Sequence, residues 1–214
     1  MIVVSEDLIN QFKEAVVVMD IDSARKACEE ALTKGVEPFK IIQDGIVEAV
    51  KIVGERFEAE EYFLPELIMA GEIITKTMEI LEPHIKSASK SKGKVVIGTG
   101  KGDMHDIGKN IVITFMKAEG FEVIDLGVDV STEKFLKTIQ IENPEILAIS
   151  ALVSSTMPEV EYVMKALNKE GLRDKVKVII GGAPITQDFV NDIGADGYAR
   201  DAIDGIKICK EWIG

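Results

Sequence analysis

The stretch GTGKGDMHDIGKN, Gly98–Asn110, follows the apolar run Lys94–Ile97 and places a histidine among glycines and acids. A β-branched run, a glycine-rich turn and then an amphipathic segment are typical of a strand, a loop and a helix in an α/β fold. Ligands of such folds bind at the carboxyl ends of the strands. The loop is therefore the first candidate site, and His105 is its unusual residue.

From this loop onward, short β-branched runs alternate with longer amphipathic segments. We count five strand–helix units, which predict a doubly wound, five-stranded parallel sheet of the flavodoxin-like or Rossmann-like kind. In chain order the segments are KVVIG, KNIVITFMKAEG, FEVIDLG, STEKFLKTIQ, EILAIS, MPEVEYVMKALNKEG, VKVIIGG, ITQDFVNDIG, DGYA and AIDGIKICKEWIG.

Before the loop, apolar residues recur at helical spacing and predict a four-helix bundle. Asp22 or Ser23 is expected to cap the second helix. The polar segment Ser87–Lys94 is typical of a linker, so the domains are expected at residues 1–90 and 91–214. The expected helices run from about Glu6 to Val18, Ser23 to Lys34, Pro38 to Phe57 and Phe63 to Ile85.

Composition excludes several classes of protein. The 214 residues are 46% hydrophobic, enough for a sizeable core, and no apolar run approaches the roughly 18 residues of a membrane span. A net charge of −12 argues against a nucleic-acid partner. Cys28 and Cys209 have no CxxC spacing and are expected to be buried and reduced. These features predict a cytoplasmic protein without nucleic-acid or membrane partners.

The stretch resembles two known phosphate-binding loops but matches neither. As a Walker A loop, GDMHDIGKN is one residue too long, and Asn110 stands where a magnesium-binding hydroxyl belongs. As a dinucleotide loop it begins correctly with Gly100 and Gly102, but His105 occupies the third glycine position. Spacing therefore disfavours nucleotide binding.

The Asp103 and His105 side chains are two residues apart and leave the same side of an extended backbone. The carboxylate can bond one ring nitrogen and leave the other free for a metal. Since structural zinc needs four protein ligands, a metal here would have to bring most of its coordination, as a corrin or porphyrin does. Taken alone, the pair favours the plainer interpretation, in which His105 caps the helix or bonds a loop carbonyl.

Three motifs together resemble the base-off, histidine-on cobalamin-binding domain. DMHDIG matches DxHxxG, Ser150–Leu152 matches SxL, and Gly181 with Gly182 matches the GG motif, in the order that family requires. The helical half, with ERFEAEEYFLPEL at Glu55–Leu67, is similar to the cap domain of methionine synthase and of small corrinoid proteins of methanogens and acetogens.

The resemblance implies that His105 is the lower cobalt ligand, that Asp103 orients it, and that Thr156 completes a hydrogen-bonded relay. Ser155 remains an alternative to Thr156. Further residues are implied in corrinoid binding, around the loop, along the nucleotide tail and in the cap. They are Gly102, Met104, Asp106, Ile107, Gly108, Ser150, Leu152, Ser154, Gly181, Gly182, Tyr198, Ala199, Phe57, Leu64, Leu67 and Ile68.

The cap residues have a second interpretation. Leu64, Leu67 and Ile68 are spaced as i, i+3 and i+4, which equally predicts a stripe facing the helical core. For any one of the four cap residues, ordinary core is the expectation that spacing alone favours.

The implied function is that of a methyl carrier, with cobalamin or a related corrinoid as cofactor and methylcobalamin as the loaded state. Donors such as methanol, methylamines or methoxylated compounds and a thiol or pterin acceptor would be served by a donor methyltransferase, an acceptor methyltransferase and a reductive activase. Little turnover is expected of the chain alone. The alternatives are a subunit of an adenosylcobalamin-dependent mutase and a cobalamin storage, delivery or sensor protein.

Overall fold

The computed structural model describes residues 2–85 and 92–213, with the side chains of the first helix described from Glu6 onward. The chain divides into two compact units, Met1–Lys86 and Ser87–Gly214. The linker expected at Ser87–Lys94, like the boundary expected at residue 90, falls largely outside the described residues. At its end that expectation is wrong, because Lys94 already begins strand β1.

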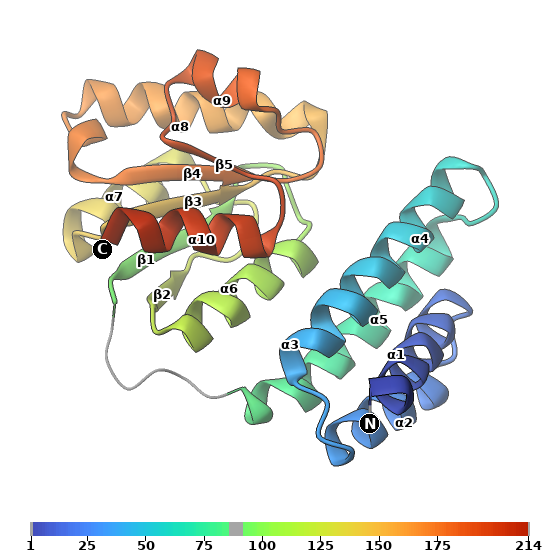
Figure 1. Cartoon of the computed structure of the whole chain (residues 1–214). Helices are drawn as coiled ribbons and strands as arrows, with labels where there is room; N and C mark the ends of the chain where they lie inside the picture. Colours follow the sequence, from blue (N-terminus) through green and yellow to red (C-terminus); the bar gives the residue numbers. More distant parts are fainter. Residues whose placement is uncertain (1, 86–91, 214) are drawn as a thin grey trace. The chain divides into compact units, whose positions relative to one another are not determined.

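The first unit is the predicted helical bundle (Figure 1). Its helices pack around buried Phe12, Ile42 and Leu81. None of the helices within the described ranges is long and apolar enough to cross a membrane. The elements are α1 (Ile2–Val17), α2 (Ile21–Thr33), α3 (Pro38–Lys40), the π-helical segment η1 (Ile41–Val47), α4 (Glu48–Glu58), α5 (Leu64–Leu81) and the 3₁₀ turn η2 (Glu82–His84).

Details of the bundle differ from the prediction. Helix α2 is capped by Asp20, whose carboxylate accepts the Ser23 amide at 3.0 Å, because the helix begins at Ile21; the expectation of a cap at Asp22 or Ser23 was wrong. The third helix has the expected extent but is π-helical in its middle. There Gly45 lies so close to Phe12 that a Cβ atom would be 2.8 Å from the ring.

The second unit is the predicted five-stranded sheet, parallel throughout, in the order β2-β1-β3-β4-β5. In Figure 1, α6 and α10 lie on one face of the sheet and α7, α8 and α9 on the other. The strands are β1 (Lys94–Thr99), β2 (Glu122–Asp125), β3 (Ile146–Ser150), β4 (Lys177–Gly181) and β5 (Gly197–Ala199). The helices are α6 (Ile107–Glu119), α7 (Thr132–Glu142), α8 (Met157–Lys169), α9 (Gln187–Ile193) and α10 (Ala202–Ile213), with 3₁₀ turns η3 (Ser154–Thr156) and η4 (Arg173–Lys175).

Helices on both faces bury the central strands, which explains their nearly continuous apolar sequences. Within β3, Ile146 to Ile149 are all buried. Cys28 and Cys209 are buried as expected, and burial raises the pKa of each thiol to about 12, with the Glu29 charge adding to the effect at Cys28. Both thiols are therefore protonated at neutral pH.

Candidate functional site

Four strands end at one level, because Thr99, Ser150, Gly181 and Ala199 are paired in a row across the sheet. The loops after these strands therefore share one edge. The histidine loop, residues 100–106, follows β1. The sheet is built outward from β1, to β2 on one side and β3 on the other, and this reversal is where doubly wound sheets bind ligands.

The histidine loop brings the predicted pair into contact. His105 Nδ1 lies 2.8 Å from Asp103 Oδ1, and the same oxygen accepts the His105 amide at 3.0 Å. The Asp103 side chain is 1% exposed, whereas that of His105 is 53% exposed. With Nδ1 engaged, Nε2 has no partner among the described residues, and the half-exposed ring can present it to a ligand.

The second carboxylate oxygen of Asp103 faces the loop after β3. It accepts the Leu152 amide at 2.7 Å and the Thr156 hydroxyl at 3.3 Å, and that hydroxyl also bonds Val153 O at 2.8 Å. Thr156 is 5% exposed, whereas Ser155 is exposed and has no contact with Asp103. Of the two hydroxyls weighed from the sequence, Thr156 is the one in line with Asp103 and His105.

Asp103 is held as a charged group despite its burial. Burial is the largest single influence and raises the pKa of the carboxyl. Hydrogen bonds from the Leu152 and His105 amides, and then from the His105 ring, together outweigh it, so the pKa lies below its usual value. An ionised Asp103 therefore faces His105.

The donor set limits what metal the loop can hold. The described residues contain no group of three or more His, Cys, Asp or Glu side chains that could surround a metal ion. A metal on His105 must bring its other ligands with it, which is the property of a macrocycle-held metal. The exposed imidazole, oriented by a buried carboxylate, fits one axial position of such a group.

The remaining loop residues surround His105. Gly102 adopts a left-handed φ of +83°, and Met104 is 65% exposed. Asp106 is the N-cap residue of α6; its carboxylate caps no backbone amide but accepts the Asn110 side-chain amide at 3.1 Å. Ile107 and Gly108 form the first turn of α6. Since the ring of His105 bonds a carboxylate, the interpretation of His105 as a helix cap or a partner of a loop carbonyl was wrong.

The residues predicted to line the nucleotide tail lie along the same edge. Gly182 approaches the next loop so closely that a Cβ atom would lie 1.8 Å from Ala151 O. Tyr198 and Ala199 end β5. Ser150 ends β3 and Gly181 ends β4, while Leu152 and Ser154 are exposed just beyond β3. Small side chains and a close backbone approach suit a flat ligand, and their role in binding stays a prediction.

The cap residues belong to the first unit. Leu64 and Ile68 are each 63% exposed, Phe57 is 43% exposed, and Leu67 is half-buried. The expectation that these residues are ordinary core is therefore wrong for Phe57, Leu64 and Ile68. The buried residues of α5 lie further along the helix, between Ala70 and Leu81.

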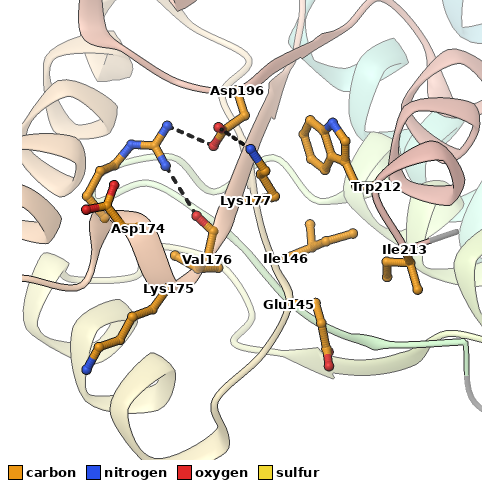
Figure 2. Close-up of a pocket in the computed structure, with 10 residues that line it drawn as sticks. Glu145, Ile146, Asp174, Lys175, Val176, Lys177, Asp196, Trp212 and Ile213 are labelled. Atoms are coloured by element: carbon orange, nitrogen blue, oxygen red, sulfur yellow. Dashed lines mark hydrogen bonds and ion pairs between the residues drawn. The ribbon is translucent and has the colours of Figure 1, made fainter.

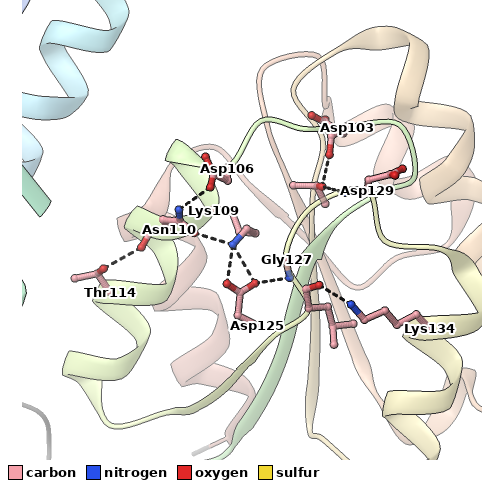
Figure 3. Close-up of polar contacts among 11 residues, drawn as sticks. Asp103, Asp106, Lys109, Asn110, Thr114, Asp125, Gly127, Asp129 and Lys134 are labelled. Carbon is pink, nitrogen blue, oxygen red and sulfur yellow. Dashed lines mark hydrogen bonds and ion pairs between the residues drawn. The ribbon is translucent and has the colours of Figure 1, made fainter. Parts of the chain in front are cut away.

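Sequence reasoning did not identify three polar residues near the loop, namely Lys109, Asp125 and Asp129. Lys109 is 2% exposed, and its ammonium bonds both Asp125 oxygens at 2.9 Å and Asn110 Oδ1 at 2.7 Å (Figure 3). Asp129 accepts the Gly102 amide at 2.7 Å. Asp125 is 16 residues from Lys109, and Gly102 is 27 residues from Asp129, so local periodicity carries no signal for these two contacts.

The buried Lys109 predicts asymmetric effects of substitution. Asp125→Ala should lower the free energy of unfolding by about 2–3 kcal/mol, since it strands a buried ammonium, although the 40% exposed carboxylate is partly screened. Lys109→Met should cost at most about 1 kcal/mol, because the remaining carboxylate can be hydrated. Urea unfolding followed by the fluorescence of the single tryptophan, Trp212 in α10, measures both. Equal losses would contradict this account.

A cavity of about 470 Å³ lies at the opposite edge of the sheet (Figure 2). Its wall includes Ile146 and Lys177, which begin β3 and β4, and the ring of Trp212. Asp196 pairs with Arg173 at 2.8 Å and Lys177 at 3.1 Å. The charged residues of the wall balance, with three positive and three negative: Arg173, Lys175, Lys177, Glu145, Asp174 and Asp196. They therefore do not mark this cavity as a second candidate site.

The chain is similar to known proteins in sequence and in structure. Two family profiles, each described as a B12 binding domain, match residues 93–207 and 8–82. The trimethylamine corrinoid protein 1 of Methanosarcina acetivorans is 41% identical over 202 residues, which cover 93% of this chain and 94% of that protein.

Solved structures agree. The monomethylamine corrinoid protein of Methanosarcina barkeri is 36% identical, with a TM-score of 0.92 over 96% of this chain and 98% of that one. A chain of the methanol:cobalamin methyltransferase complex of Methanosarcina barkeri is 31% identical, with a TM-score of 0.55 over 97% and 80%. The chain therefore belongs to the family of B12-binding corrinoid proteins, and its cofactor is cobalamin or a related corrinoid.

Proposed function

We propose that this chain carries methyl groups on its corrinoid between two methyltransferases, the first of which takes the methyl group from a methylated amine. The observation that carries the proposal is the half-exposed imidazole of His105, held by the buried Asp103. The relatives named for trimethylamine, dimethylamine and monomethylamine favour amines as the donor class. A relative within a methanol:cobalamin methyltransferase complex supports a methyltransferase partner.

In this proposal His105 Nε2 would bind the cobalt of the corrinoid. Asp103 Oδ1 accepts the Nδ1 proton, so the tautomer with a free lone pair on Nε2 is favoured. The Leu152 amide and the Thr156 hydroxyl hold the other carboxylate oxygen and keep Asp103 from turning away. The bound corrinoid supplies a cobalt atom that can accept and release a methyl group.

The other predicted residues would bind the corrinoid. The small residues at the ends of β3, β4 and β5 would hold the nucleotide tail against backbone. Phe57, Leu64, Leu67 and Ile68 would offer apolar contacts to the corrinoid. A reductive activase would restore cofactor that has become oxidised.

The test of the site is the visible absorption spectrum and the affinity of the protein for hydroxocobalamin, measured by equilibrium dialysis. His105→Ala should lose the histidine-ligated spectrum and bind at least about tenfold more weakly, since it removes the imidazole that is proposed to ligate cobalt. His84→Ala is the matched control, because His84 is the only other histidine and is exposed in η2. Unchanged binding by His105→Ala would sink the proposed site.

The carrier role has its own test. Protein loaded with hydroxocobalamin and reduced with titanium(III) is mixed with a methylamine methyltransferase and isotope-labelled trimethylamine, dimethylamine, monomethylamine or methanol. We expect label on the protein with at least one amine, and its release to a thiol when an acceptor methyltransferase is added. Stable corrinoid binding without labelling by any donor would favour storage or delivery instead.

A further inference from the structure

The turn after β2, residues 126–130, packs against the histidine loop and bonds to its backbone. Gly100 and Val130 form a bridge between the two segments, and the Thr99 amide bonds Gly127 O at 3.2 Å. The Thr99 hydroxyl donates to Asp103 O at 2.5 Å. The histidine loop therefore rests on this turn as well as on its own strand.

Asp129 is the residue through which the turn holds the loop. Its carboxylate accepts the Gly102 amide at 2.7 Å. Its own amide lies 3.0 Å from both Asp103 O and Thr99 Oγ1. Figure 3 labels Asp129 and Asp103. The backbone is thus tied to Asp129 on each side of the Asp103 side chain. A shift of these ties would move the carboxylate that orients His105.

The backbone of Asp129 is unusual. Its φ is +52°, a left-handed value that costs a residue with a side chain about 1 kcal/mol or more. Glycine would adopt this conformation freely. Aspartate adopts this conformation at a higher free energy than glycine would, but its carboxylate accepts the Gly102 amide. This indicates that the side chain has a role that glycine cannot fill.

We infer that Asp129 is a positioning residue for the cobalt ligand: through Gly102 and Asp103 it sets where His105 presents Nε2. The inference rests on the proposed role of His105. It concerns a residue outside the DxHxxG, SxL and GG motifs, and Asp129 acts on the loop and not on the corrinoid.

Three variants separate the side chain from the backbone. Asp129→Gly keeps the left-handed conformation and removes the carboxylate. Asp129→Asn keeps an acceptor for the Gly102 amide and tolerates positive φ. Asn143→Gly is the matched control, because Asn143 also has a positive φ, of +45°, but lies after α7 at the opposite edge of the sheet.

Two measurements follow for each variant. Residue-resolved amide hydrogen exchange in the cofactor-free protein should be about tenfold faster at Gly102 in Asp129→Gly, since its hydrogen bond is lost. With hydroxocobalamin, Asp129→Gly should bind about tenfold more weakly and show a reduced histidine-ligated fraction. Asp129→Asn should stay within about twofold of wild type, because a neutral acceptor remains, and Asn143→Gly should match wild type in both measurements.

The outcomes are distinguishable. Wild-type exchange, affinity and spectrum in Asp129→Gly would overturn the inference while leaving His105 as the ligand. Equal losses in Asn143→Gly would overturn it too, by showing a general effect of glycine. No histidine-ligated spectrum in wild type would remove the proposed function and this inference together. If Asp129→Gly does not fold, Thr99→Val removes the hydroxyl shared by both segments, and a wild-type spectrum there overturns the inference.

Discussion

Gly182→Ala is expected to lower the free energy of unfolding of the second unit by about 3–5 kcal/mol. The new Cβ would lie 1.8 Å from Ala151 O and 2.7 Å from Ala151 C, and φ at this position is +131°, where side chains are strained. Backbone atoms cannot rotate away as a flexible side chain can. The fluorescence of Trp212 during urea unfolding reports on this unit.

Gly194→Ala is the matched control for Gly182→Ala. Gly194 also has a positive φ, of +73°, but a Cβ atom there meets nothing within 4 Å. Its loss should be only about 1 kcal/mol, the cost of the backbone conformation alone. If both variants lose the same stability, the close approach to Ala151 is not what requires glycine at position 182.

The effect of Gly182→Ala should extend to the histidine. Displacing Ala151 moves the adjacent Leu152, whose amide donates to Asp103 Oδ2. A variant that still folds should therefore bind hydroxocobalamin more weakly, with less of it ligated by histidine. The backbone of the SxL motif, at Ala151 and Leu152, thus links Gly182 of the GG motif to Asp103 of the DxHxxG motif.

The architecture was predictable because its signals are local. Strand, loop and helix alternate in the sequence with few exceptions, and each buried strand is short, apolar and β-branched. The π-helical form of Ile41–Val47 was not predictable, since α and π segments share the same apolar spacing at this length. The structural feature that accompanies the π-helical segment is the close approach of Gly45 to Phe12 in α1, another helix.

The site was predictable only in part, and for the same reason. Asp103 and His105 are two residues apart, so their contact follows from the motif. Whether Ser155 or Thr156 lies beside Asp103 depends on the 3₁₀ turn after β3, which buries Thr156 and exposes Ser155. Lys109 stands in an amphipathic helix where a lysine normally faces solvent, and only its partner on β2 explains its burial.

Asp103→Asn keeps the size of the side chain but removes its negative charge and one of its two acceptor oxygens. Both carboxylate oxygens act as acceptors: Oδ1 accepts the amide of His105, and Oδ2 accepts the amide of Leu152. Asparagine offers one oxygen and one amino group, so in either orientation a donor faces a donor in a buried place. The free energy of unfolding should fall by about 1–3 kcal/mol.

The histidine should respond as well, and this response distinguishes a site from a merely stable loop. Without a charged partner at Nδ1, His105 is a poorer ligand, so the histidine-ligated fraction of bound hydroxocobalamin should fall by about tenfold or more. Asp192→Asn is the matched control, since Asp192 is an exposed aspartate in α9 and is not among the residues implied in corrinoid binding. A loss of stability in Asp103→Asn with an unchanged spectrum would mean that Asp103 holds the loop together but does not orient the ligand.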